Sequence, residues 1–301
     1  MTPGTTGSTS SAELGSTAAS SAGTTSTAST DTGPAGAGPT GTGPTTTDPS
    51  GAVGSGDPAV TARGSSVDRL WHELPSVAFD TETTGVAVAT DRIVTAALVR
   101  RALHDDVPLT SRAWLVDPGV EIPAGATAVH GISTEHARTH GRSPVEALEE
   151  VAAELAASVR AGETVVAFNA SYDLTILDHE LHRHGLTPLA ERLDGAPLTV
   201  IDPLILDRTF DRYRKGKRTL SHLCTVYGVA VTEELHSADA DASVTLGVLA
   251  RIALRYPRLV EMDRAALMEF QREEHRAWAV GFNEWRERRG MTGPPVSTTW
   301  L

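Results

Sequence analysis

One stretch of the sequence organises the rest, Val77-Ala78-Phe79-Asp80-Thr81-Glu82-Thr83-Thr84-Gly85. Its first residues are apolar with high strand propensity, and its Thr-Thr-Gly ending is typical of a turn. In a strand, alternate side chains point to the same face and lie roughly 6.5–7 Å apart. Asp80 and Glu82 therefore share one face of the predicted strand, and Phe79 and its alternates point to the other.

The acidic pair of Asp80 and Glu82 has two open interpretations. Two carboxylates this close repel each other, so a cation should offset them. A divalent ion such as Mg²⁺ suits the pair because hard cations take oxygen ligands. The alternative is an exposed strand end that is acidic without binding an ion, and the pair by itself does not decide between the two.

The composition is that of an acidic protein with a single cysteine. The 301 residues carry a formal net charge of −12. Such a protein does not attract nucleic acid through its overall field, so nucleic-acid binding requires a local basic patch or bound cations. The lone Cys224 excludes an internal disulfide and a cysteine-based structural zinc site. We interpret it as a small buried hydrophobe in a protein of the reducing cytoplasm.

The composition changes along the chain and predicts three segments. Residues 1–66 are rich in Gly, Ser, Thr, Ala and Pro, and we expect this leader to be disordered because it cannot bury enough apolar surface. Residues 67–256 have the composition of a globular domain, and residues 257–301 are predicted as a helical extension and tail. The leader lacks the features of a signal peptide, and no stretch has the roughly 20 apolar residues of a membrane helix, so no membrane partner is expected.

The hydrophobic pattern predicts an α/β domain. Strands at 77–81, 93–103 and 111–116, with a polar turn at 104–108, favour an antiparallel ribbon. An amphipathic helix at 144–160 follows, and then strands and helices alternate. The later strands are expected at 163–168 and 198–202, and the later helices at 171–184, 220–227, 240–255 and 264–289. This order predicts a mixed five-stranded sheet flanked by helices, with three antiparallel strands first and parallel strands after them.

Two further polar motifs lie at predicted helix starts. The first contains Asn169 and Asp173, and the second contains His236 and Asp241. A structural role is the alternative for each acid alone, because the helix dipole stabilises a carboxylate near a helix N-terminus by about 0.3–1 kcal/mol. Asp239, two residues before Asp241, is expected to be a helix cap.

Taken together, the motifs resemble those of the DnaQ-like 3′–5′ exonucleases of the DEDDh type, a family that includes proofreading subunits of replicative DNA polymerases. The family pattern is D-x-E, then N-x-x-x-D, then H-x-x-x-x-D, and it is matched in order by Asp80, Glu82, Asn169, Asp173, His236 and Asp241. The stretch Val129-His130-Gly131-Ile132-Ser133 is also similar to a family element. The resemblance covers about residues 77–256. The sequence departs from the family at Phe168, where many relatives have His. A polar contact from this position is therefore not expected, whereas the metal site is unaffected.

The resemblance implies an RNase H-like fold with a two-ion site. It implies that Asp80, Glu82, Asp173 and Asp241 bind two Mg²⁺ or Mn²⁺ ions and that His236 is the general base. Two ions about 3.5–4 Å apart generate hydroxide at neutral pH and stabilise charge on the attacking and leaving oxygens. Histidine suits the remaining need for a proton acceptor because its unperturbed pKa is near 6.5.

Substrate contacts are predicted beside these motifs. By resemblance, Thr83 and Thr84 contact the terminal sugar, and Asn169 also belongs to the substrate site. His130 is either a groove residue or a packed turn histidine. A basic cluster could bind phosphates or could be a solvated loop; it consists of Arg208, Arg212, Arg214, Lys215, Lys217 and Arg218. Asp202 and Asp207, which flank an apolar strand end, are expected to be structural.

The resemblance thus implies a metal-dependent exonuclease that hydrolyses phosphodiester bonds at a single-stranded 3′ end of DNA, in proofreading or repair. A DNA polymerase subunit is a candidate partner. Two alternatives stay open: a 3′–5′ exoribonuclease that trims RNA, and a non-catalytic nucleic-acid-binding or scaffold protein that keeps the fold. The complete acidic set together with His236 favours an enzyme.

Overall fold

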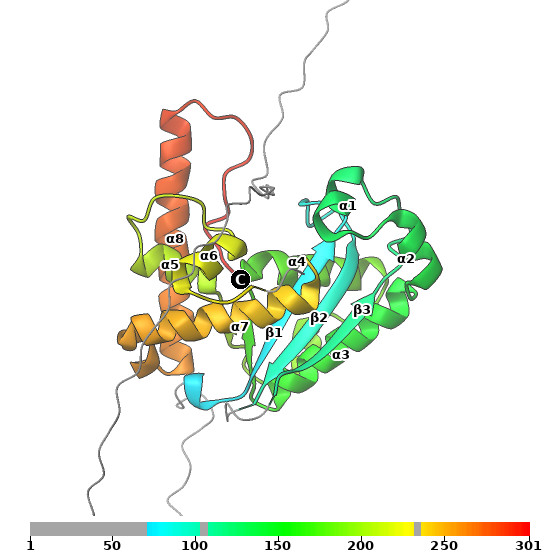
Figure 1. The fold of residues 1–301 in the computed structure, drawn as a ribbon, viewed down its shortest axis with the longest axis horizontal. Coiled ribbons are helices and arrows are strands. Elements are labelled where there is room, and N and C mark those ends of the chain that lie inside the picture. The colour runs from blue at the N-terminus through cyan, green and yellow to red at the C-terminus, as the bar shows by residue number, and fades with distance from the viewer. Residues whose placement is uncertain (1–70, 103–107, 232–235) are drawn as a thin grey trace, which may run out of the picture. The chain divides into compact units, whose positions relative to one another are not determined.

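The structure, a computed structural model, describes residues 71–102, 108–231 and 236–301 (Figure 1). The leader predicted at 1–66 and most of the turn predicted at 104–108 lie outside the described residues. The described residues belong to one compact unit. Among the helices in these ranges, none combines the length and the apolar character that a membrane span requires.

A mixed sheet with β1 at its centre forms the framework. The strand order is β3-β2-β1-β4-β5. β1 pairs with β2 and β2 with β3 in antiparallel fashion, whereas β4 is parallel to β1 and β5 is parallel to β4. The strands are β1 (Ser76–Thr83), β2 (Ile93–Arg101), β3 (Thr110–Leu115), β4 (Thr164–Val166) and β5 (Val200–Ile201). The predicted mixed sheet, with three antiparallel strands followed by parallel ones, is confirmed.

Helices cover both faces of this sheet, which is why β1 is apolar on both sides. Phe79 packs into the core that contains α3 and α4, whereas Ala78 packs into the core that contains α6 and α7. Figure 1 shows α7 crossing one face of the sheet. The helices are α1 (Ala124–His130), α2 (Thr134–His140), α3 (Pro144–Arg160), α4 (Ala170–Arg183), α5 (Pro203–Phe210), α6 (Leu220–Tyr227), α7 (Ala238–Arg255) and α8 (Arg264–Arg288). Cys224 is buried in the second core, as predicted.

Three short helices, α1, α2 and α5, were not predicted from the sequence. Local signals exist for two of them. Ser133 caps α2 by accepting a hydrogen bond from the backbone N–H of His136 at 3.1 Å. Asp202 caps α5 by accepting from Leu204 N at 2.9 Å, and Pro203 occupies the first helical position, where its missing N–H has no cost.

α8 closes the edge of the sheet at β5. The side-chain amide of Gln271 accepts from Asp202 N at 2.8 Å and donates to Val200 O at 2.9 Å. The sulfur of Met268 accepts from Val200 N at 3.0 Å. These bonds satisfy backbone groups that an edge strand leaves unpaired. The extension predicted from residue 257 thus contributes α8 to the packing of the domain.

Candidate active site

Three carboxylates converge where β1 meets the start of α7. Asp80 and Glu82 project from β1, and Asp241 lies in the first turn of α7. One carboxylate oxygen from each of them lies within 4.8 Å of the others. The register of β1 against β2 is irregular between Glu82 and Thr83, so the strand is bulged where these side chains project. The geometry brings together three of the four predicted metal ligands.

Asp173 lies close to this cluster but faces the strand backbone. It is 3% exposed in the first turn of α4. Its Oδ1 accepts hydrogen bonds from Thr81 N at 3.0 Å and from Thr81 Oγ1 at 2.7 Å. Asp173 is therefore not part of the three-carboxylate group, although it is near enough to raise the pKa values of Asp80 and Glu82.

Burial and mutual repulsion raise the pKa values of the clustered carboxyl groups. Burial, and then the charges of Asp241 and Asp173, raise the pKa of Glu82 to about 8. Burial is also the main reason why the pKa of Asp80 lies well above its usual range, with repulsion from Asp173, Asp241 and Glu82 adding to it. Burial raises the pKa of Asp241 as well. The hydrogen bond from the backbone N–H of His236 acts in the opposite direction and lowers this pKa, but the effect of burial is larger. The charged cluster is thus unfavourable by itself, as expected of oxygen donors arranged for a cation.

His236 stands in the turn that leads into α7. Its φ of 92° is unusual for a residue with a side chain. Its backbone N–H donates to Asp241 Oδ1 at 3.3 Å. The residue is exposed. The hydrogen bond between His236 and Asp241 is therefore made by the backbone, and the imidazole is not required for it.

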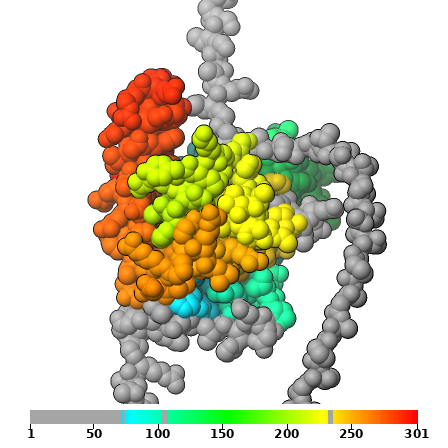
Figure 2. Space-filling model, turned by 60° about the vertical axis from the view of Figure 1, so that its left-hand side comes forward, coloured from blue at the N-terminus to red at the C-terminus, as the bar shows by residue number. Residues whose placement is uncertain are grey.

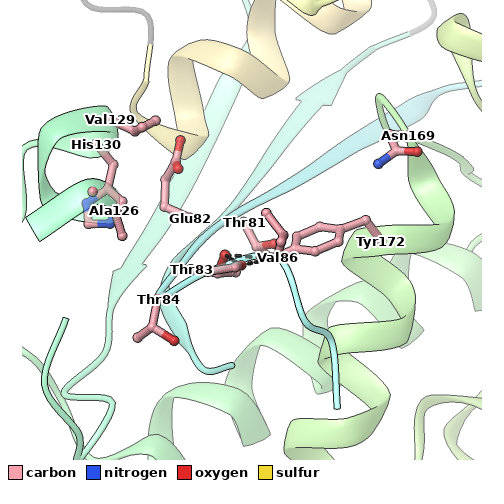
Figure 3. A pocket seen from close by; sticks show the side chains of 12 residues that line it. Thr81, Glu82, Thr83, Thr84, Val86, Ala126, Val129, His130, Asn169 and Tyr172 are labelled. Atoms are coloured by element: carbon pink, nitrogen blue, oxygen red, sulfur yellow. Dashed lines mark hydrogen bonds between the residues drawn. The ribbon is translucent and has the colours of Figure 1, made fainter. Parts of the chain in front are cut away.

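A pocket of about 620 Å³ adjoins the carboxylates through Glu82 (Figure 3). All four residues predicted to contact substrate line it, namely Thr83, Thr84, His130 and Asn169. The other lining residues are Thr81, Glu82, Gly85, Val86, Gly125, Ala126, Val129 and Tyr172. His130 Nδ1 accepts from Ile132 N at 3.2 Å, and burial lowers the pKa of its imidazole, so His130 is both a packed turn histidine and a pocket residue.

The backbone of Asn169 is held in place at the N-terminus of α4, where this residue occupies the N-cap position. Its φ of 64° is left-handed, a conformation that Asn tolerates better than most residues. The two carboxylate oxygens of Asp202 accept from Asn169 N and Ala170 N, each at 3.0 Å. Asp202, which also caps α5, is structural as predicted, and it supports a residue of the pocket.

Tyr172 is a pocket residue that the motifs did not reveal. Its ring extends from α4 towards Thr83 and Val86 (Figure 3). The Tyr172 hydroxyl lies 2.7 Å from Thr83 Oγ1 and donates to Gly85 O at 2.5 Å, while Thr83 Oγ1 lies 2.7 Å from the same carbonyl. Because Asp173 holds Thr81, two adjacent residues of α4 fix β1 on both sides of Glu82.

Tyr172→Phe is therefore expected to lower turnover about five- to tenfold with a small loss of stability, since a single net hydrogen bond contributes about 0.5–1.5 kcal/mol. Steady-state kinetics on an oligonucleotide would measure it. When Tyr172→Phe is combined with Thr83→Val, the double variant should lose less transition-state stabilisation than the sum of the two single variants, because both substitutions break the same hydrogen-bond network. Additive effects would show that the hydroxyl acts elsewhere.

The predicted basic cluster divides into inward and outward cations. Arg214 and Arg218 both pair with the buried carboxylate of Asp207, so they are structural and do not contribute to a solvated loop. Arg208 is stacked on the ring of Trp278, with 3.8 Å between its Cζ and the ring centroid.

The predicted capping role of Asp239 is wrong, because α7 begins earlier than expected and Ser237 occupies the N-cap position.

The chain is similar to known exonucleases and polymerases. The RNase_T family model, described as Exonuclease, matches residues 77–249. A DNA polymerase III PolC-type from Streptococcus agalactiae is 30% identical over 207 residues, which are 68% of this chain and 13% of the relative. A DNA polymerase III subunit epsilon-like protein from Rhodobacter capsulatus is 31% identical over 182 residues, which are 60% of this chain and 24% of the relative. The chain thus spans only a small part of these relatives' length.

Among solved structures, E. coli Exonuclease I in complex with a dA16 oligonucleotide has a TM-score of 0.54 at 20% identity. The match covers 62% of this chain and 42% of that one. At this identity the likeness concerns the fold. It confirms the predicted RNase H-like arrangement of the sheet and its helices.

Proposed function

The chain belongs to the Exonuclease family, whose model spans residues 77–249, and from this premise we propose that it is a metal-dependent 3′–5′ exonuclease acting on a single-stranded DNA end. The observation that carries the proposal is the meeting of three carboxylates beside a pocket. Glu82 belongs to both. A nucleotide held in the pocket would therefore present its phosphate to the acidic cluster.

The residues fit divalent ions, and we propose two Mg²⁺ or Mn²⁺. Asp80, Glu82 and Asp241 supply hard oxygen donors whose charges repel one another without a cation. Asp173 would complete the set by turning one oxygen from Thr81 towards the cluster. Such ions, when bound, supply Lewis acidity that activates water and neutralises charge on the scissile phosphate.

The chain's own residues would supply orientation and proton transfer. The bulged end of β1, held by Tyr172 and Asp173, would position the terminal nucleotide against Thr83 and Thr84. His236 would accept the proton of the attacking water, because it sits in the turn beside Asp241 and is exposed. The products would be a nucleoside monophosphate and a strand shortened by one nucleotide.

DNA is the proposed substrate because the similar curated proteins are DNA polymerase III chains. The same likeness supports a DNA polymerase subunit as a partner and a role in replication or repair. The negative charge of the whole protein favours a single strand fed into a local site over a duplex held along its surface.

The function is tested with a 5′-labelled single strand incubated with Mg²⁺ or with EDTA. A ladder that shortens from the 3′ end only with Mg²⁺ is the expected result. DNA and RNA strands of the same sequence should be compared, and cleavage of RNA alone would replace the DNA proposal with the RNA-trimming one. No ladder with either polymer would favour a non-catalytic binding protein.

A further inference from the structure

The connection between α5 and α6 holds a basic segment in a defined conformation. Asp207 is fully buried, and its carboxylate pairs with Arg214 at 2.6 Å and with Arg218. Its other oxygen accepts from the Tyr227 hydroxyl at 2.9 Å. Arg218 also donates to the backbone carbonyl of Asp211 at 2.5 Å. These inward contacts anchor both ends of residues 212–217, which we call the Tyr213 loop.

The anchoring leaves the other side chains of the loop exposed, and among them Arg212 forms an ion pair with Glu274 of α8 at 3.5 Å. Tyr213 is 92% exposed, which is unusual for a large aromatic residue. Lys215 and Lys217, the chain's only two lysines, are exposed as well. Neither lysine forms an ion pair with any residue that the structure describes. An exposed ring therefore stands between cations on a protein whose net charge is −12.

We propose that the Tyr213 loop binds the single strand upstream of its 3′ end, with Tyr213 stacking on a base and the two lysines contacting phosphates. This inference rests on the proposed function. Exposed aromatic rings combined with cations are the usual means of holding single strands without sequence preference. A protein partner fits less well, because the cores of protein interfaces are depleted in lysine and the ring has charged neighbours.

The position of the loop matches this role. α5 begins directly after Asp202, whose carboxylate holds Asn169 at the pocket. The loop lies beyond the other end of α5, which has eight residues and is therefore about 12 Å long. Figure 2 shows the yellow-green surface of this region beside the orange and red surface of α8. The loop would thus meet nucleotides several positions from the terminal one, which predicts dependence on strand length.

Equilibrium binding of a long fluorescent oligonucleotide in EDTA tests the loop without requiring hydrolysis. Tyr213→Leu should weaken binding about thirtyfold, the middle of the range for one stacked base, whereas Tyr213→Phe, which keeps the ring, should bind as the wild type does. Lys215→Gln combined with Lys217→Gln should reduce the slope of log K against log salt by about 1.4, or about 0.7 for each phosphate contact on a single strand. Arg258→Gln is the matched control, because this exposed cation follows the far end of α7.

Turnover separates the inference from the proposed function. The loop variants should raise KM for a long strand and leave cleavage of a dinucleotide unchanged. Unchanged binding, salt slope and length dependence in all loop variants would overturn the inference and leave the exonuclease proposal intact. A wild-type protein that cleaves neither polymer would refute the exonuclease proposal, while the binding measurements would still decide the role of the loop. Loss of folding in Tyr213→Leu, seen by circular dichroism, would also overturn it, since an exposed ring should not support the fold.

Discussion

Asp80→Asn is expected to lower turnover of a single-stranded oligonucleotide by about three orders of magnitude, the size of effect that loss of one electrostatic stabiliser has in other active sites. Asp80 is one of the three clustered carboxylates, and burial together with repulsion from Asp173, Asp241 and Glu82 raises its pKa. An amide has the shape of the carboxyl group but no charge, so it holds a divalent ion more weakly. The measurement is kcat at saturating Mg²⁺.

The same substitution is expected to stabilise the metal-free protein at alkaline pH. The pKa of Asp80 is raised in the folded state, so between the unfolded and folded pKa values the folded protein holds a proton that the unfolded chain has released. That contribution to stability is present at low pH and is lost as pH rises through the folded pKa. In EDTA near pH 8 the variant should therefore have the higher Tm, and the difference should vanish at a pH near 4, close to the unfolded pKa.

Mg²⁺ provides the control for both effects. It should raise the Tm of the wild type at pH 8 and raise that of Asp80→Asn less, because an ion that binds only the folded state stabilises in proportion to its affinity. Asp178→Asn, on the exposed face of α4, should change neither turnover nor the response to Mg²⁺. An Asp80→Asn variant with wild-type turnover would overturn the proposed ion site.

His236→Ala is the second large prediction, with turnover expected to fall by about 10²–10⁴-fold while Mg²⁺ affinity stays near that of the wild type. The bond between His236 and Asp241 Oδ1 comes from the backbone N–H, which the variant keeps. The carboxylates should therefore remain in place when the imidazole is removed. Turnover and an Mg²⁺ titration on the same preparation would measure the two quantities.

The backbone at His236 calls for a companion variant. Its φ of 92° is strained for alanine, whereas asparagine tolerates the left-handed region better. His236→Asn should lose turnover to the same extent, and His182→Ala, on the exposed side of α4, should lose none. Retained turnover in both His236 variants would remove the histidine from the mechanism and leave the ion site untouched.

The main helices and strands could be predicted from the sequence because their buried positions recur with the period of each element, which produces a recognisable hydrophobic pattern. The helix predicted at 144–160 coincides with α3, whose buried stripe includes Leu148, Val151 and Leu155. The first strand was readable from its acids and its apolar start. α1, in contrast, has no buried residue, so no apolar stripe marks it. α5 was missed because its first apolar residues follow β5 without a break, and only Asp202 and Pro203 signal a helix start.

The candidate site was predicted as a set of residues, but not as a set of contacts. The family resemblance named Asp80, Glu82 and Asp241 as ligands of one site, and their carboxylates lie within 4.8 Å of one another in the structure. The resemblance did not reveal that Asp173 bonds to Thr81, since this depends on how closely α4 approaches β1. The contacts of the Tyr172 hydroxyl with Thr83 and Gly85 could not be predicted either, because these partners lie beside a bulge of β1 that has no signal in the local sequence. Charge density likewise marked the basic cluster without telling which arginines turn inward to Asp207.

The amide of Gln271 has a consequence for solubility. The amide bonds to Asp202 N and Val200 O in the way that the backbone of a neighbouring strand would. The edge of the sheet at β5 therefore cannot pair with a strand from another molecule. Gln271 lies beyond residue 249, where the family match ends. A fragment limited to the matched residues would leave β5 open to intermolecular pairing and would remove the support of Asp202 N. Protection against aggregation and alignment of the pocket thus depend on the same helix, α8.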